Sequence, residues 1–302
     1  MRVGVIGVGA MGQHHARVYS EMDNCQLVGI VDKDATRAKE IASRYGTKAV
    51  GSVEDLIKLH PDAVSIAVPT SIHKEVAIKF LKNGIACLVE KPISATIEDA
   101  QEIIDTAKKS ETILMVGHIE RFNPAVLKLK DLITKGELGK VLVLSAKRVG
   151  PQAPRVMDVG IIIDLATHDI DVVRFLVGRE PRNIYARYGS YNWHKEDYAL
   201  ILLDFEEAIA SIEVNWFTPY KVRTLVATGT NAIANLNYID QTIEINSNTI
   251  KRMVEVNKRE PLRVEQEHFI ECVRNNKRPL VDGIEGLKDL KIALSALEKG
   301  AN

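Results

Sequence analysis

The stretch RVGVIGVGAMG, residues Arg2–Gly12, decides the fold of the first part of the chain. Its apolar run predicts a buried β-strand over Arg2–Ile6, and the residues after Gly12 predict a helix. The pattern G-x-G-x-x-G between a strand and a helix is typical of a dinucleotide-binding turn. In such a turn Gly7 permits the sharp bend, and Gly9 lets the backbone approach a pyrophosphate. Gly12 lets the helix pack closely on the sheet.

An acidic residue stands where such a turn needs one. A second predicted strand, Gln26–Val31, ends at Asp32, twenty residues beyond Gly12. A carboxylate there accepts hydrogen bonds from the adenosine ribose and repels a 2′-phosphate, so Asp32 favours NAD over NADP. Lys33 and Arg37 nearby leave NADP as the less favoured alternative. We expect these residues to bind the cofactor: Gly7, Gly9, Ala10, Met11, Gly12 and Asp32.

Strands and helices alternate up to about residue 118. Apolar runs predict strands at Ala63–Val68, Ile85–Val89 and Ile113–Val116, with a short one at Ala49–Val50. This rhythm predicts an α/β fold with a Rossmann-type, doubly wound parallel sheet over residues 1–118. Beyond it, most segments read as strands. We therefore expect residues 119–302 to form an α+β domain with a large, mostly antiparallel sheet, serving substrate binding and oligomerisation.

Two predicted loops follow strand ends, where open α/β sheets bind their ligands. In Glu90-Lys91-Pro92, Pro92 lacks an N–H group and ends the strand, which leaves Lys91 at its carboxyl end. Taken alone, this short segment more often indicates a solvated surface lysine, and only the motifs around it favour a functional role for Lys91. The loop after Val68 carries a second polar set. We expect both loops to flank the nicotinamide half of a cofactor through Pro69, Thr70, His73, Glu90 and Lys91.

A second group of polar residues lies in the predicted second domain. Asp164 and His168 are four residues apart in a predicted amphipathic helix over Ile161–Val177, which places them on one face. A histidine beside an aspartate is often structural, so the pair points to acid–base chemistry only together with Lys91. We assign Asp169 and Asp171 to solvent or capping, and His14 and His15 to packing.

Composition limits the partners. The 302 residues carry 40 Lys+Arg and 40 Asp+Glu, so no net field favours nucleic acid or an anionic membrane. No apolar run approaches the roughly 18 residues of a membrane span. The three cysteines have neither disulfide nor metal-ligand spacing, and the first residues lack a signal-peptide pattern. We expect a cytoplasmic protein without a metal.

These motifs, in this order, resemble those of the Gfo/Idh/MocA family of oxidoreductases. The matching residues are the glycine turn, Glu90-Lys91-Pro92, Asp164-x-x-x-His168 and the Pro69-Thr70-Ser71-x-His73 loop. The resemblance implies that Lys91, Asp164 and His168 form the catalytic group, and that Glu90-Lys91-Pro92 lines the nicotinamide site. His168 is the expected general base, with Lys91 as the alternative.

Within that family, the chain more closely resembles enzymes that oxidise C3 of UDP-N-acetylglucosamine. The matching strings are Gly117–Pro124, Arg148–Pro151 and Pro154-Arg155. This resemblance implies NAD-dependent oxidation of a UDP-amino sugar to a 3-keto sugar and NADH. An inositol-type polyol dehydrogenase and a non-catalytic NAD- and sugar-binding sensor are the alternatives.

Substrate and subunit contacts are also expected in the second domain. Guanidinium groups suit phosphate oxygens, so the arginines are candidates for a substrate diphosphate. The expected substrate-binding residues are Arg121, Asn123, Arg148, Arg155, Asp164 and His168. A broad sheet needs cover on both faces, and we expect a homodimer or homotetramer through it.

Overall fold

The structure, a computed structural model, describes residues 1–151 and 159–300. Its contacts divide the chain into two compact units. The first unit holds Met1–His118 and Leu262–Leu290, and the second holds Ile119–Pro261 and Lys291–Asn302. The return of 262–290 to the first unit departs from the continuous second domain expected from the sequence. It is held there partly by Gln266, which donates to the backbone oxygen of His15.

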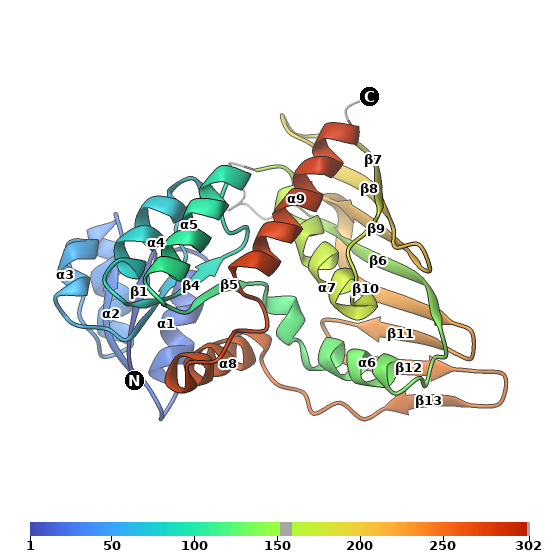
Figure 1. Ribbon diagram of the computed structural model, residues 1–302, viewed down its shortest axis with the longest axis horizontal. Helices are drawn as coiled ribbons and strands as arrows, with labels where there is room; N and C mark the ends of the chain where they lie inside the picture. Colours follow the sequence, from blue (N-terminus) through green and yellow to red (C-terminus); the bar gives the residue numbers. More distant parts are fainter. Residues whose placement is uncertain (152–158, 301–302) are drawn as a thin grey trace. The chain divides into compact units, whose positions relative to one another are not determined.

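The first unit contains a five-stranded parallel sheet in the order β2-β1-β3-β4-β5 (Figure 1). The predicted parallel α/β sheet is confirmed. The expected strand at Ala49–Val50 is reduced to a single bridge between Ala49 and Ile30. The strands are β1 (Arg2–Ile6), β2 (Gln26–Val31), β3 (Ala63–Ile66), β4 (Ala86–Glu90) and β5 (Leu114–Gly117).

Helices connect these strands, and several begin at the caps that the sequence provides. The Asp34 carboxylate accepts from two N–H groups at the start of α2, and the Thr96 hydroxyl accepts from the N–H of Asp99 at the start of α5. The helices of this unit are α1 (Gly12–Ser20), α2 (Ala35–Arg44), α3 (Val53–Ile57), α4 (His73–Leu81), α5 (Ile97–Lys109) and α8 (Pro261–Asn275), with a 3₁₀ turn η1 (Thr70–Ile72). Helix α9 (Gly283–Gly300) continues from the first unit into the second.

The second unit contains an eight-stranded sheet in the order β13-β12-β11-β10-β6-β9-β8-β7. All neighbours are antiparallel except β6 and β9, which confirms the expected mostly antiparallel sheet. The sequence did not predict β13. The strands are β6 (Val141–Pro151), β7 (Asn183–Gly189), β8 (Tyr198–Asp204), β9 (Ile209–Asn215), β10 (Phe217–Gly229), β11 (Ile233–Asn237), β12 (Thr242–Asn246) and β13 (Lys251–Val254).

Helices cover one face of this sheet. They are α6 (Pro124–Thr134), α7 (Thr167–Val177) and the end of α9, with short η2 (Ile119–Phe122) and η3 (Ile162–Ala166) segments (Figure 1). Along β8, Ile201 and Leu203 are buried towards the helices, whereas Leu200 and Leu202 remain exposed on the opposite face. Within the described ranges, no helix combines the length and apolar character needed to cross a membrane.

Candidate active site

The glycine turn after β1 has two glycines fixed by packing and one facing open space. Gly7 adopts φ +80°, and a Cβ there would lie 2.5 Å from the backbone oxygen of Ala67. A Cβ on Gly12 would lie 1.7 Å from the backbone oxygen of Gly7. A Cβ on Gly9 would meet nothing within 4 Å. The turn therefore needs Gly7 and Gly12 for its own shape, and its backbone at Gly9 is accessible to a ligand.

Helix α1 begins directly after this turn, with its N-terminus open to an anion. Met11, at the N-cap, makes no side-chain capping hydrogen bond, and the first turn contains no acidic residue. The N–H groups of Gln13 and His14 bond to the backbone oxygens of Gly9 and Met11, so the turn attracts an anion mainly through the positive end of the helix dipole. The residues around Gly9, Ala10 and Met11 fit the pyrophosphate of a dinucleotide.

Asp32 lies beside the same turn, at the end of β2. Its carboxylate accepts hydrogen bonds from the N–H of Val8 at 2.7 Å and from the N–H of Asp34 at 2.9 Å. The nearest guanidinium nitrogen of Arg37 lies 4.0 Å away. These bonds fix the carboxylate against the glycine turn. Each of its oxygens has capacity for a further hydrogen bond, so a ribose hydroxyl fits the same group.

A cavity of about 400 Å³ adjoins these residues within the first unit. Gly7, Gly9, Asp32 and Pro69, all expected from the sequence, line it. Much of the remaining wall is apolar, including Val31, Val53, Ile72 and Val76. A largely apolar hollow with a few fixed polar groups suits a nucleotide base and its ribose. The residues present fit the adenosine half of the cofactor.

At the end of β4, the Glu90 carboxylate is held by a partner from another helix. The ring Nε2 of His15, on α1, lies 2.8 Å from Oε1 of Glu90, and the N–H of Lys91 donates to Oε2. Burial raises the pKa of Glu90, but the hydrogen bond from His15 and the nearby positive charges outweigh it, so the net pKa is lowered. The strand thus ends on an ionised carboxylate directly before Lys91. His15 is buried, as its expected packing role requires, and it also contacts one particular side chain, Glu90.

His73 joins the loops that follow β3 and β4. It is the first residue of α4 and is buried. Its Nδ1 lies 3.0 Å from the backbone oxygen of Pro92, and its Nε2 lies 2.9 Å from that of Val68. Since both ring nitrogens face protein carbonyls, we revise its expected role from a cofactor ligand to a support for both loops. Thr70 lies in η1, which belongs to the connection from β3 to α4, and Pro69 directly precedes it.

Asp164 and His168 lie where a π-helix meets an α-helix. The expected continuous α-helix is wrong over Ile162–Ala166, which forms the π-helix η3. Asp164 belongs to η3, and His168 belongs to the first turn of α7. A π turn contains one more residue than an α turn, so a spacing of four no longer guarantees the shared face. Single π turns inside helices are uncommon and occur frequently at functional sites.

The two described arginines of the expected substrate set are committed to carboxylates of α7. Arg121 donates from Nε to Asp171 at 3.1 Å, and Arg148 donates from Nε to Asp169 at 2.6 Å. Both arginines and both aspartates are buried. The assignment of Asp169 and Asp171 to solvent or capping is wrong, because each is paired with a guanidinium.

Arg148 also donates from Nη1 to a second carboxylate, at 2.9 Å from Oε1 of Glu120. Burial alone lowers the pKa of Arg148, but the charges of Asp169 and Glu120 outweigh it and raise the pKa overall. A guanidinium whose charge is already neutralised by two carboxylates binds a phosphate only weakly. The ion pairs of Arg121 with Asp171 and of Arg148 with Asp169 thus hold α7 in place, and they replace the diphosphate contacts expected for these arginines.

Asn123 is also occupied within its own unit. Its side-chain oxygen accepts from the N–H of Ala125 and caps α6, which has Pro124 at its first position. Its amide nitrogen donates to the backbone oxygen of Tyr238 at 3.0 Å. The expected sugar contact is replaced by this capping role. Arg155 lies outside the described residues.

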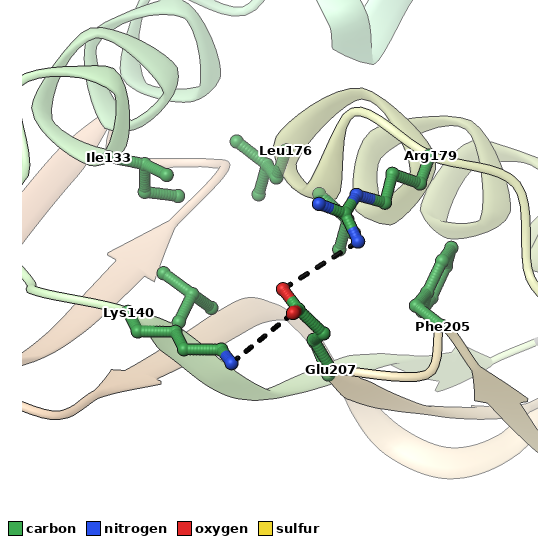
Figure 2. A pocket seen from close by; sticks show the side chains of 9 residues that line it. Ile133, Lys140, Leu176, Arg179, Phe205 and Glu207 are labelled. Carbon is green, nitrogen blue, oxygen red and sulfur yellow. Dashed lines mark ion pairs between the residues drawn. The ribbon is translucent and has the colours of Figure 1, made fainter.

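A smaller cavity of about 150 Å³ lies in the second unit, between α6, α7 and the turn after β8 (Figure 2). The Glu207 carboxylate forms ion pairs with two of the lining residues, at 3.5 Å from Nζ of Lys140 and 3.6 Å from Nη1 of Arg179. Within the described part of the chain, its lining includes none of the residues proposed from the sequence. This hollow is not the candidate active site.

Known proteins match both halves of this arrangement. A family model described as an oxidoreductase family with an NAD-binding Rossmann fold matches residues 1–118, and a GFO/IDH/MocA C-terminal domain model matches residues 126–235. UDP-N-acetylglucosamine 3-dehydrogenase of Acidithiobacillus ferrooxidans is 31% identical, over 97% of this chain and 95% of the relative. The chain belongs to the Gfo/Idh/MocA oxidoreductase family.

A solved structure and a second relative support the placement of this Gfo/Idh/MocA oxidoreductase. A solved structure of the Acidithiobacillus enzyme superposes with a TM-score of 0.93, covering 100% of this chain and 98% of that one. The scyllo-inositol 2-dehydrogenase (NAD(+)) of Bacillus subtilis is 28% identical, over 100% of this chain and 94% of the relative. The first domain is thus an NAD-binding Rossmann domain, and its glycine turn, Asp32 and cavity fit that cofactor.

Proposed function

We propose that this protein oxidises the C3 hydroxyl of UDP-N-acetylglucosamine, or of a related UDP-amino sugar, and forms a 3-keto sugar and NADH. The observation that carries the proposal is the match to a UDP-N-acetylglucosamine 3-dehydrogenase, at 31% identity and over nearly the whole of both chains. Its coarser part is the oxidation of a sugar or polyol hydroxyl. The inositol dehydrogenases among the relatives support this part as well.

The proposed catalytic residues are Lys91, Asp164 and His168. Oxidation of a secondary alcohol removes a hydride from carbon and a proton from oxygen, and bound NAD accepts the hydride. His168 accepts the proton as general base, and Asp164 orients its imidazole or binds an adjacent hydroxyl. Lys91 donates a hydrogen bond to the reacting oxygen, with the role of base as its alternative.

Fixed neighbours in each unit support these assignments. Lys91 follows Glu90, whose carboxylate is anchored to α1 through His15. His168 is adjacent to Asp169, and the ion pair of Asp169 with Arg148 ties the first turn of α7 to β6. A catalytic group performs best on rigid elements whose position is set by surrounding hydrogen bonds, and both segments meet that condition.

An inositol-type dehydrogenase is the second candidate function. It is favoured by the Bacillus subtilis scyllo-inositol 2-dehydrogenase, which matches over the entire chain at 28% identity. Its substrate has no phosphate, whereas a UDP-sugar carries a diphosphate. The two candidates therefore differ in whether the protein needs an anion-binding group near the sugar.

A substrate panel tests the proposal. The full-length protein is mixed with NAD⁺ and, in turn, UDP-N-acetylglucosamine, N-acetylglucosamine, scyllo-inositol or myo-inositol, and NADH is followed by its absorbance. We expect turnover with the UDP-sugar and a product lighter by two hydrogens. Turnover of an inositol alone would transfer the assignment to the second candidate.

Lys91→Ala tests the catalytic assignment in the same assay. We expect kcat to fall by roughly 10²- to 10⁴-fold, the range for a general acid–base group. Lys82→Ala, at an exposed lysine after α4, is the matched control and should leave kcat unchanged. Equal rates in the two variants would remove Lys91 from the mechanism.

We also propose that the uncovered face of the eight-stranded sheet forms a homodimer or homotetramer interface. Large apolar side chains are exposed along β7, β8 and β9 on this face: Tyr185, Tyr198, Leu200, Leu202 and Ile209. Contiguous exposed apolar side chains on a sheet are typical of a protein interface.

A further inference from the structure

Two arginines lie directly opposite each other in the second unit. Arg148 of β6 and Arg223 of β10 form a cross-strand pair in an antiparallel ladder. Directly opposite residues project from the same face, and like charges in such positions destabilise a sheet. The next pair on that face, Ala146 with Leu225, is buried. Two guanidinium groups thus share the helix-covered face of the sheet.

Within the described part of the chain, one of these two charges is paired with carboxylates and the other is not. Arg148 is paired with Asp169 and Glu120, at 2.6 and 2.9 Å. For Arg223, no carboxylate of residues 1–151 or 159–300 lies within ion-pair distance. Its Nη1 donates to the backbone oxygens of Val149 and Val222. Carbonyl oxygens satisfy these N–H groups but leave the charge in place.

The unused side of Arg223 has the geometry of an anion receptor. With Nη1 occupied by two carbonyls, the N–H groups of Nε and Nη2 make no hydrogen bond with any described residue. These two nitrogens form the edge of the guanidinium that binds two oxygens of one phosphate or carboxylate in parallel. Among residues 1–151 and 159–300, no group occupies the bidentate edge of Arg223.

The surroundings of Arg223 connect it to the candidate active site. Burial and the charge of Arg148 lower the pKa of Arg223, while Asp169, Glu120 and Asp164 act in the opposite direction. Asp164, of the proposed catalytic group, is thus among the charges that act on this guanidinium. An anion at the unused edge of Arg223 would gain a charge-assisted, bidentate hydrogen bond, which favours a negatively charged ligand there.

We propose that Arg223 binds a phosphate oxygen of the substrate diphosphate and thereby selects nucleotide sugars over free sugars. The proposal rests on the proposed oxidation of a UDP-sugar and names the residue that recognises its anionic part. It replaces Arg121 and Arg148, whose charges are already neutralised inside the unit. The substrate diphosphate carries two negative charges, against one on a carboxylate, and its oxygens suit the bidentate edge of a guanidinium.

Calorimetric titration of the full-length protein with UDP tests this assignment without turnover. We expect Arg223→Gln to weaken UDP binding by roughly 10- to 100-fold, the cost of losing a charge-assisted hydrogen bond. Arg223→Lys should recover part of the loss, since it restores the charge but not the fork. Lys147→Gln is the control, because Lys147 is exposed on the neighbouring strand and projects from the opposite face. Unchanged UDP affinity in Arg223→Gln would overturn the assignment.

Steady-state kinetics separate recognition from a structural role. Arg223→Gln should raise the KM for the UDP-sugar and leave the KM for any free sugar or polyol that turns over unchanged. A fall in kcat with every substrate, at unchanged UDP affinity, would mark Arg223 as structural. If Arg223→Gln does not fold, Arg223→Lys decides on the same readouts.

The outcomes also separate this assignment from the proposed function. UDP binding that depends on Arg223, without oxidation of any UDP-sugar, would sink the proposed function and leave the anion site standing. Oxidation of a UDP-sugar by Arg223→Gln at wild-type KM would support the proposed function and overturn the anion site at Arg223. Failure of wild-type protein to bind UDP would overturn the anion site.

Discussion

Nε2 of His15 lies 2.8 Å from Oε1 of Glu90, which links two segments 75 residues apart. His15 lies on α1, the helix whose N-terminus fits the cofactor pyrophosphate, and Glu90 ends β4 directly before Lys91. The bond therefore couples the position of the phosphate-binding helix to that of the proposed catalytic lysine. Both side chains are largely withdrawn from solvent, at 0% and 12% exposure, so the contact is little screened by water.

Removing the imidazole should destabilise the first unit. His15→Leu leaves the buried, ionised carboxylate of Glu90 without its hydrogen-bond donor, and we expect a loss of about 3 kcal/mol in the free energy of unfolding. Glu90→Gln should cost less, because a neutral amide still bonds His15. Urea denaturation followed by circular dichroism at pH 7 measures both. His14→Leu, at the exposed neighbouring histidine, is the control, and equal losses at positions 14 and 15 would contradict the prediction.

Asp32 should set the preference between the two nicotinamide cofactors. Asp32→Asn keeps a side-chain oxygen for the glycine turn but removes the charge that repels a 2′-phosphate. With Lys33 and Arg37 still nearby, we expect the ratio of NADPH to NADH affinity to rise about tenfold. Fluorescence titration with each reduced cofactor measures the ratio. Glu40→Gln, at an exposed acid of α2, should not alter it, and an unchanged ratio in Asp32→Asn would remove Asp32 from cofactor selection.

Placing a charge on the uncovered sheet face should separate subunits. Leu200 is 55% exposed at the middle of β8, and Leu200→Lys puts an ammonium group among the apolar side chains of the proposed interface. We expect wild-type protein to have a multiple of the 33.5 kDa chain mass and Leu200→Lys to shift towards 33.5 kDa with little change in Tm. Light scattering after gel filtration measures this. Ile284→Lys, in the other unit, is the control. A wild-type monomer at micromolar concentration would end the proposal.

The parallel sheet was accessible from the sequence because its signals are local. The apolar run before Glu90 and the glycine turn after Ile6 each specify a strand end without reference to the rest of the chain. The cap at Asn123 was also accessible in principle, since Asn followed by Pro is typical of a helix start. The sequence thus predicts the helix start correctly, but it does not show that capping occupies the Asn123 side chain in place of a sugar contact.

The buried ion pairs could not be predicted from local sequence signals. Asp171 and Arg121 are 50 residues apart, and Asp169 and Arg148 are 21 apart, so neither aspartate shows its partner in its own segment. An acid in a helix reads as solvated unless the fold brings a cation to it. The π-helix at Ile162–Ala166 was missed for a similar reason, because its apolar residues are equally compatible with an α-helix.

His73 should make stability depend on pH below neutrality. Its folded-state pKa is lowered, chiefly by burial, and the two carbonyl contacts only partly oppose this effect. In the unfolded chain a histidine has a pKa of about 6.5. As pH falls through that value, the unfolded state therefore binds a proton that the folded state does not. Stability from this group is complete above about pH 7 and is lost as pH falls, by at most about 1.4 kcal/mol per pH unit.

His73→Gln should remove this component, because glutamine still donates to a loop carbonyl and does not titrate. We expect the free energy of unfolding of the wild type to fall more steeply between pH 7 and pH 5.5 than that of His73→Gln, with the variant somewhat less stable at pH 7. His14→Gln, at an exposed histidine, should retain the wild-type slope. Urea denaturation at a series of pH values measures all three proteins. Parallel slopes for wild type and His73→Gln would show that His73 is protonated in the folded protein, and its two carbonyl contacts would then both be hydrogen bonds donated by an imidazolium.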